Sequence, residues 1–243
     1  MKLALDRILQ SQGFGSRKGC RELIADGEVA INGELATDYR TVFETDGMLI
    51  TLFGEEDWPY RERLYVALNK PTNYECSRKP SHHPGILTLL PDPLIERDIQ
   101  PVGRLDHDTT GLLLLSDDGA FIHAQSHPRH HQPKTYLATV AEAATEKLVQ
   151  HLRDGVQLHD EPAPIAALSA RMVDEFHIEM VLDQGKYHQV KRMLAAAGNH
   201  CAALTRVAIG GLTLASLDLG EGEWRYLTDE HIAALNREPD LSA

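Results

Sequence analysis

The chain has 243 residues, enough for one full domain and a small second one, and its hydrophobic fraction of 42% indicates a folded core. Its formal net charge of −12 argues against a general nucleic-acid-binding surface, although local patches decide what a cleft attracts. Three widely separated cysteines, Cys20, Cys76 and Cys201, argue against a disulfide framework and fit a reducing compartment.

The chain begins with MKLALDRILQ, which has charges at Asp6 and Arg7 and no apolar run long enough for a signal peptide or a membrane span. We therefore expect a cytoplasmic protein without a membrane partner.

Residues 1–53 predict a small domain with two helices and a short sheet. Apolar residues at helical spacing predict a helix within residues 3–13, and Ser16 is a suitable N-cap for a second helix over 17–26. That second helix carries three basic residues on its outer side: Arg17, Lys18 and Arg21. Strands are expected at 29–31, before the hairpin signal Asn32-Gly33, and at 48–52.

A polar segment broken by Pro59, residues 54–63, is expected to be a linker. Residues 64–243 then form the larger domain, which begins with a strand from Leu64. The remaining pattern predicts strands at 134–140, 165–173, 176–182 and 201–209, and helices at 86–90, 119–126, 144–154, 190–197 and 228–236. Thr228 is expected to cap the last of these helices.

The central stretch of this domain is GRLDHDTTGLLLLSDDG, residues 103–119. Four apolar residues from Leu112 to Leu115 predict a buried strand, and Thr109-Thr110-Gly111 predicts a turn before it. Charged residues at 104–108 precede that turn. From the residues alone they are either solvated loop charges or a carboxylate held rigidly for chemistry.

Two metal-site hypotheses arise from the sequence. His127, His130 and His131 lie close together, but no Cys or carboxylate follows at zinc-site spacing, and the nearby basic residues fit a phosphate-facing loop better. Asp106 and Asp108 could hold a divalent metal for a metal-dependent transferase, although Arg104 competes for the same carboxylates. No glycine-rich phosphate loop is present. We expect no metal.

Several ordered motifs resemble a known family. Residues 16–34, SRKGCRELIADGEVAINGE, resemble the alpha-L type of RNA-binding domain. The whole chain resembles RNA pseudouridine synthases of the RsuA family, and SHPRHHQPKTY (126–136) resembles the branch that modifies 16S rRNA. The motifs that carry this resemblance are LNKP (68–71), GRLDHDTTGLLLLSDDG (103–119), KTYLATV (134–140), GKYHQVKRMLAAAGNH (185–200) and LTRVAIGGL (204–212).

The resemblance implies an α+β fold with a mixed, mainly antiparallel sheet, and it implies roles for individual residues. Asp106 matches the catalytic aspartate, and Tyr136 matches the tyrosine that stacks on the target uracil. Lys191 stands where the family usually has an Arg that pairs with the aspartate, and a lysine cannot make the same two-pronged contact. Leu204 matches an apolar residue that lines the pocket. Further substrate contacts are expected from Arg104, Arg129, His130, Lys134, Arg192 and Arg206.

The implied activity is isomerisation of uridine to pseudouridine in 16S rRNA or an assembling small ribosomal subunit, by a monomer that needs no cofactor. Alternatives remain open at this point. Tyr136 alone fits a core aromatic residue, Lys191 and Arg192 fit the polar face of a helix, and the chain fits a catalytically silent RNA-binding assembly protein if its site is inactive.

Overall fold

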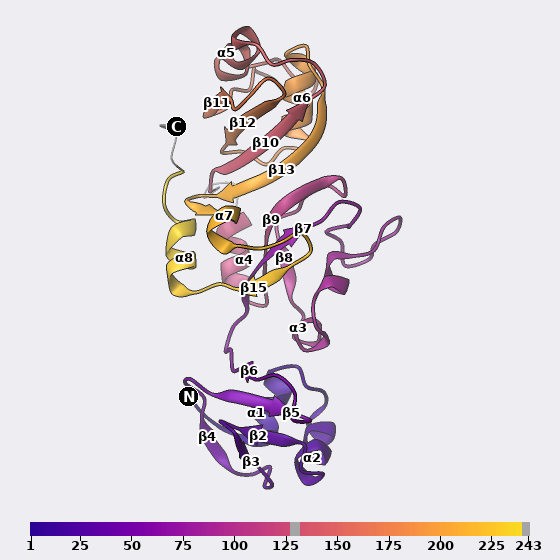
Figure 1. The fold of residues 1–243 in the computed structure, drawn as a ribbon, viewed down its shortest axis with the longest axis vertical. Coiled ribbons are helices and arrows are strands. Elements are labelled where there is room, and N and C mark those ends of the chain that lie inside the picture. Colours follow the sequence, from indigo (N-terminus) through magenta and orange to yellow (C-terminus); the bar gives the residue numbers. More distant parts are fainter. Residues whose placement is uncertain (127–131, 240–243) are drawn as a thin grey trace. The chain divides into compact units, whose positions relative to one another are not determined.

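The structure, a computed structural model, describes residues 1–126 and 132–239 (Figure 1). It divides into two compact units. The first contains Met1–Leu64 together with Leu90–Gln100, and the second contains Tyr65–Leu89 and Pro101–Ala243. The first unit is therefore discontinuous in sequence, unlike the contiguous domain expected at 1–53. No described helix is both long and apolar enough to cross a membrane.

In residues 1–64, the first unit contains two helices and two small sheets, and its second segment adds the short helix α3 (Asp92–Glu96). Ser16 caps the second helix as predicted, because its side chain accepts a hydrogen bond from the Gly19 amide. The hairpin at Asn32-Gly33 is also confirmed, since positive φ angles at both residues allow the tight turn between β2 and β3. The helices are α1 (Leu5–Ser11) and α2 (Arg17–Ala25), and the sheets pair β1 (Lys2–Ala4) with β4 (Val42–Glu44) and join β3 (Glu34–Leu35), β2 (Val29–Ile31), β5 (Leu49–Leu52) and β6 (Trp58–Pro59).

The segment expected as a linker is partly structured. Strand β6 pairs with β5, and the Arg61 amide donates to the Gln12 side chain. Arg97, which follows α3 (Asp92–Glu96), donates to the carbonyl oxygens of Arg61 and Glu62. Residues 58–62 therefore belong to the first unit, and the polar composition that predicted a linker instead reflects a surface edge strand.

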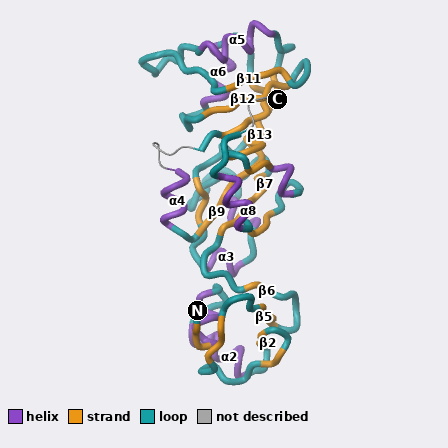
Figure 2. The backbone as a smooth tube through the Cα atoms, turned by 90° about the vertical axis from the view of Figure 1, so that its left-hand side faces the viewer, coloured by secondary structure: helices purple, strands orange, loops and turns teal. Residues whose placement is uncertain are grey.

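The second unit is built on a nine-stranded sheet that is mixed and mainly antiparallel, as predicted (Figures 1 and 2). Strands β9 and β13 form a parallel pair, which joins two halves whose strands pair antiparallel along the main order. The main order is β11 (Ser169–Met172), β12 (His177–Leu182), β10 (Lys134–Val140), β13 (Cys201–Ile209), β9 (Thr109–Ser116), β7 (Tyr65–Lys70) and β15 (Trp224–Tyr226), with β8 (Gln100–Val102) on β9 and β14 (Leu212–Thr213) on β13.

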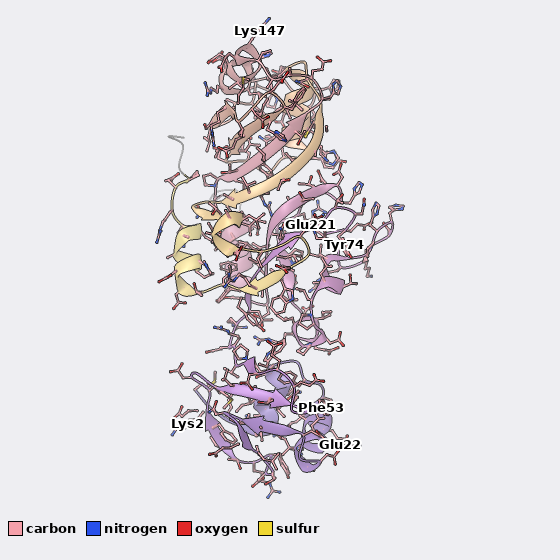
Figure 3. All side chains as sticks on the ribbon, in the orientation of Figure 1. Lys2, Glu22, Phe53, Tyr74, Lys147 and Glu221 are labelled. Carbon is pink, nitrogen blue, oxygen red and sulfur yellow. The ribbon has the colours of Figure 1, made fainter. Side chains whose placement is uncertain are left out.

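Each half of the sheet has its own helices and its own core. In the first half, α5 (Glu146–Asp154) and α6 (Gln189–Ala196) pack beside β10–β12 on residues such as Leu152 and Met193. In the second half, α4 (Gly119–Ser126), α7 (Leu214–Leu217) and α8 (Asp229–Leu235) surround a core that includes Leu114 and Leu235. A short helix at Ile86–Leu89 completes the unit. Figure 3 shows the side chain of Lys147 projecting from α5 away from the sheet.

The turn predicted at Thr109-Thr110-Gly111 is wrong, because these residues begin strand β9. They pair with Leu204, Thr205 and Arg206 of β13, and the Thr110 and Thr205 hydroxyls lie 2.8 Å apart. Local turn propensity is overridden here by a strand that comes more than ninety residues later. The buried strand at 112–115 and the Thr228 cap of the last helix are both confirmed.

Candidate active site

The loop that carries Asp106 is anchored at both ends. Leu105 is buried, and its amide donates to the Cys76 thiol sulfur at 3.5 Å. Thr109 is also buried, and its amide donates to the Asp106 carbonyl oxygen at 3.1 Å. Buried anchors on either side restrict the backbone conformations that the intervening residues can adopt. The carboxylate of Asp106 is therefore presented from a fixed turn of backbone.

Lys70 ties this loop to the end of β7. Its side chain is fully buried, and Nζ donates to the carbonyl oxygens of Pro71, His107 and Thr109 at 2.9, 3.2 and 2.9 Å. Burial lowers the pKa of Lys70 below its ordinary value, although nearby charged groups oppose that shift. Lys70 lies in the LNKP motif, but no role was predicted for it from the sequence. A lysine next to Pro at the end of a buried strand was the available signal.

Asp106 shares a cation with Asp108. Lys191 Nζ, from α6, lies 3.4 Å from Asp106 Oδ2 and 2.7 Å from Asp108 Oδ1. His188 Nε2 also lies 3.4 Å from Asp106 Oδ2. The predicted pairing of Asp106 with Lys191 is thus present, but the shorter contact goes to Asp108. Neither Asp108 nor His188 was assigned a role from the sequence, although both stand inside the quoted motifs.

The pKa shifts in this cluster follow from burial and the ion pairs. Burial acts to lower the pKa of Lys191, but its hydrogen bond to Asp108 and the charges of both carboxylates outweigh burial, so the pKa lies above its ordinary value. For Asp108 burial acts to raise the pKa, and Lys191 outweighs it, so that pKa lies below its ordinary value. The pair is charged at neutral pH.

A cleft of about 840 Å³ opens beside Asp106. Tyr136 on β10 is half-buried in its wall and lies directly opposite Arg206 of β13 in the strand register. Residues opposite one another on antiparallel strands project from the same face, so both side chains face the same space. The predicted site residues that line the cleft are Arg104, Asp106, Lys134, Tyr136, Leu204 and Arg206.

One predicted substrate contact, Arg192, is not brought to this cleft. Arg192 donates to the Tyr187 carbonyl oxygen at 3.1 Å and forms an ion pair with Asp160, so its guanidinium is engaged within the protein. It does not line the cleft, because its place on α6 directs it to the loop around Asp160. Arg129 and His130 lie outside the described residues.

Several buried polar atoms in the cleft wall have no hydrogen-bond partner among the described residues. They are Thr109 Oγ1, Gln125 Oε1 and Arg206 Nη2. Buried polar groups are nearly always paired, so unpaired atoms gathered at one cleft indicate where a ligand supplies the missing partners. Gln125 and Thr109 were not predicted as site residues.

The basic residues predicted on the first unit have two different environments. Arg17 and Arg21 each donate through Nε to Asp6 Oδ2 at 2.8 Å, and the Asp6 side chain is only 1% exposed. Lys18 is exposed and lies 3.7 Å from Glu22. Burial acts to raise the pKa of Asp6, but the two arginines outweigh it and leave the pKa below its ordinary value. The arginines therefore also hold α1 against α2.

Neither metal-site hypothesis gains support from the side-chain geometry. Lys191 holds the space beside Asp106 and Asp108 that a divalent cation would need, and no cluster of three potential ligands occurs in residues 1–126 or 132–239. His127, His130 and His131 lie outside those ranges. The cation that competes for the carboxylates is Lys191 rather than Arg104, which is exposed in the cleft wall.

Comparison with known proteins gives consistent relatives along the chain. The RNA pseudouridylate synthase family matches residues 64–196, and the S4 domain family matches residues 5–46. The chain is 36% identical over 235 residues to the ribosomal small subunit pseudouridine synthase A of Escherichia coli, which covers 96% of this chain and 100% of that relative. An uncharacterized RNA pseudouridine synthase of Bacillus subtilis is 33% identical over 238 residues, with 96% and 98% covered. A crystal structure of a pseudouridylate synthase matches with a TM-score of 0.66 and 34% identity, covering 96% of this chain and 99% of that one.

Proposed function

The chain belongs to the RNA pseudouridylate synthase family, and from that membership we propose that it converts uridine to pseudouridine in small-subunit ribosomal RNA, with Asp106 as the reacting carboxylate. The choice of Asp106 as the reacting carboxylate rests on one observation. Its carboxylate lines the cleft, contacts a lysine at 3.4 Å, and shares the cleft with the tyrosine on β10. Asp108 contacts the same lysine but does not line the cleft.

The substrate assignment follows the relatives. The Escherichia coli protein that matches this chain from end to end is named for the small ribosomal subunit, and so is a relative from Yersinia pestis with 37% identity over 240 residues, 96% of this chain and 98% of that relative. The S4 match supports an RNA contact by the first unit, for which Lys18 offers the exposed charge. We further propose that the chain acts as a monomer.

The reaction breaks the bond between ribose C1′ and uracil N1, turns the base, and joins C1′ to uracil C5. The proton on C5 is lost and N1 gains one, so the atoms balance without hydrolysis, redox chemistry or a cofactor. An ionised Asp106 can add to C1′ of the ribose or to C6 of the uracil and leave again when the new bond forms. Lys191 Nζ places a positive charge 3.4 Å from the carboxylate that reacts.

The target base must leave its stack to reach this cleft, which costs a few kcal/mol. Stacking on Tyr136 offsets part of that, on the order of 1–3 kcal/mol. Leu204, which is buried, lines the same cleft with an apolar surface. Replacing Tyr136 with Phe should keep most of the stacking, whereas Tyr136→Ala should weaken base capture, and equal activity in both variants would remove this role.

The decisive experiment maps pseudouridine in ribosomal RNA from cells that lack this protein. One small-subunit position should lose its modification, and a gene copy with Asp106→Asn should fail to restore it, with a rate at least about 1,000-fold below wild type in purified form. The matched control is Asp108→Asn, which removes the other carboxylate at Lys191 and should keep activity within about tenfold. Unchanged modification combined with immature subunits would instead favour a silent assembly protein.

A further inference from the structure

Two cations, Lys134 and Arg206, line the same cleft, and neither forms an ion pair with a carboxylate of the described residues. Arg206 is only 2% exposed, and its Nε donates to the Leu112 carbonyl oxygen at 2.7 Å. Its Nη2 is one of the unpaired buried atoms of the cleft wall. Lys134 is half-buried on the neighbouring strand, and its Nζ donates to the Gln132 carbonyl oxygen at 2.9 Å.

The carboxylates that line the cleft contact groups other than Lys134 and Arg206. Asp106 contacts Lys191 and His188, and the Glu75 carboxylate accepts hydrogen bonds from the backbone amides of residues 81–83. Within the described part of the chain, neither Lys134 nor Arg206 forms an ion pair. A buried charge without a counter-charge is costly, and it is retained where a ligand supplies the opposite charge.

The pKa of Lys134 also reflects the absence of a neighbouring carboxylate. Burial and, after it, the positive charge of Arg206 together lower this pKa to about 8. On the neighbouring strands, Leu182 of β12 and Ile209 of β13 lie opposite Lys134 and carry no charge. The other titratable groups that line the cleft are Glu75, Cys76, His82, His83, Arg104, Asp106, His107, Tyr136, Lys186, Tyr187 and His188.

We propose that Lys134 and Arg206 together bind one backbone phosphate of the nucleotide whose base is isomerised. The proposal rests on the proposed function and names the group of the RNA that this part of the cleft receives. Tyr136 lies opposite Arg206 in the register, so a base stacked on the tyrosine has its own phosphate within reach of both cations. A neutral uracil carbonyl would fill the vacant position on Arg206 Nη2 but leave both charges unbalanced.

The test uses a short RNA that contains the mapped uridine, with the 5′ or the 3′ phosphate of that uridine replaced by an uncharged methylphosphonate. One of the two replacements should weaken binding to the wild-type protein on the order of tenfold. In Lys134→Met the same replacement should cause a much smaller further loss. The matched control is Lys186→Met, because Lys186 also lines the cleft but is paired with Glu161 at 2.7 Å, and it should keep the full sensitivity.

The proposal is overturned if neither methylphosphonate weakens binding, or if the loss is equal in the wild type and Lys134→Met. Binding is the readout here, so failure of the proposed chemistry would appear separately, as wild-type protein that binds the unmodified RNA without forming pseudouridine.

A second measurement guards against a Lys134→Met protein that does not fold. Because the phosphate favours the charged lysine, RNA binding at pH 8 should draw up to about 0.5 proton from the buffer, seen as a binding enthalpy that depends on the buffer's ionisation enthalpy. Lys134→Arg keeps the charge at all relevant pH values and should abolish this uptake. Equal uptake in both proteins would also overturn the proposal.

Discussion

Replacing Gly111 with alanine should strongly destabilise the second unit, because a Cβ on this residue of β9 would collide with the backbone of β13. Gly111 has a φ angle of +100°, and a Cβ there would lie 2.3 Å from the Arg206 carbonyl oxygen and 2.9 Å from its amide nitrogen. Both atoms are backbone, so the two strands themselves must move apart. The left-handed backbone adds about 1–2 kcal/mol and overpacking about 1–3 kcal/mol, which together give a loss of about 2–5 kcal/mol.

Two other glycines separate these contributions. Gly103 has a φ angle of +76° but open space around its Cβ position. Gly103→Ala should therefore lose only the stability that the left-handed backbone costs, about 1–2 kcal/mol. Gly119 has open space and no positive φ, so Gly119→Ala should change stability little.

Urea unfolding measured by tryptophan fluorescence is a suitable assay, because the chain has only two tryptophans. Trp58 belongs to the first unit and Trp224 to the second, so a Trp58→Phe background reports the second unit alone. If Gly111→Ala is no less stable than Gly103→Ala in this assay, the close approach of β9 and β13 does not limit the fold, and the reasoning is refuted.

Three further predictions concern charged side chains. Lys70→Met should destabilise the second unit by about 3–5 kcal/mol, because three carbonyl oxygens lose the buried lysine that donates to them, and a loss under 1 kcal/mol in the same urea assay would contradict this. Asp6→Asn should destabilise the first unit by about 2–4 kcal/mol at neutral pH, followed by Trp58 fluorescence in a Trp224→Phe background. The pKa of Asp6 is lowered in the folded state, so the stability difference between wild type and Asp6→Asn should be complete above the ordinary pKa of Asp. It should disappear as the pH falls through the pKa of Asp6 in the folded protein. A stability difference that persists at pH 2 would contradict this prediction. Lys191→Met should lower kcat on the order of 100-fold with a smaller change in KM, while Lys191→Arg restores most of the rate, and a wild-type kcat in the Met variant would exclude a role for this cation.

The elements that local chemistry specifies could be predicted from the sequence. Ser16 and Thr228 cap their helices, Asn32-Gly33 forms its hairpin, and Leu112–Leu115 is a buried strand. Each depends on a few neighbouring residues. The start of β9 could not be predicted in the same way, because its partner strand lies far away in sequence and outweighs the turn propensity of Thr109-Thr110-Gly111.

The residue types of the candidate site could be predicted from the sequence, but the contacts between those residues could not. Asp106, Tyr136 and Lys191 came from a resemblance, and the structure brings Lys191 to Asp106 while giving its shorter contact to Asp108. The sequence cannot show which carboxylate a lysine prefers, since that depends on the loop conformation between buried Leu105 and Thr109. Nor does it show that Arg192 turns to Asp160, a residue from a different loop.

The parallel pairing of β9 with β13 also has a consequence for how the protein is made. Asp106 and Lys191 are separated by 85 residues in sequence, and the strand that brings them together is not complete until residue 209 has been added. Loop closure over such a distance delays contact formation, and nascent domains fold only once their last required segment has left the ribosome. β15, which pairs with β7 at the opposite edge, is added later still. Catalytic competence is therefore acquired only after β13 has been translated, so that a chain interrupted before β13 cannot modify RNA.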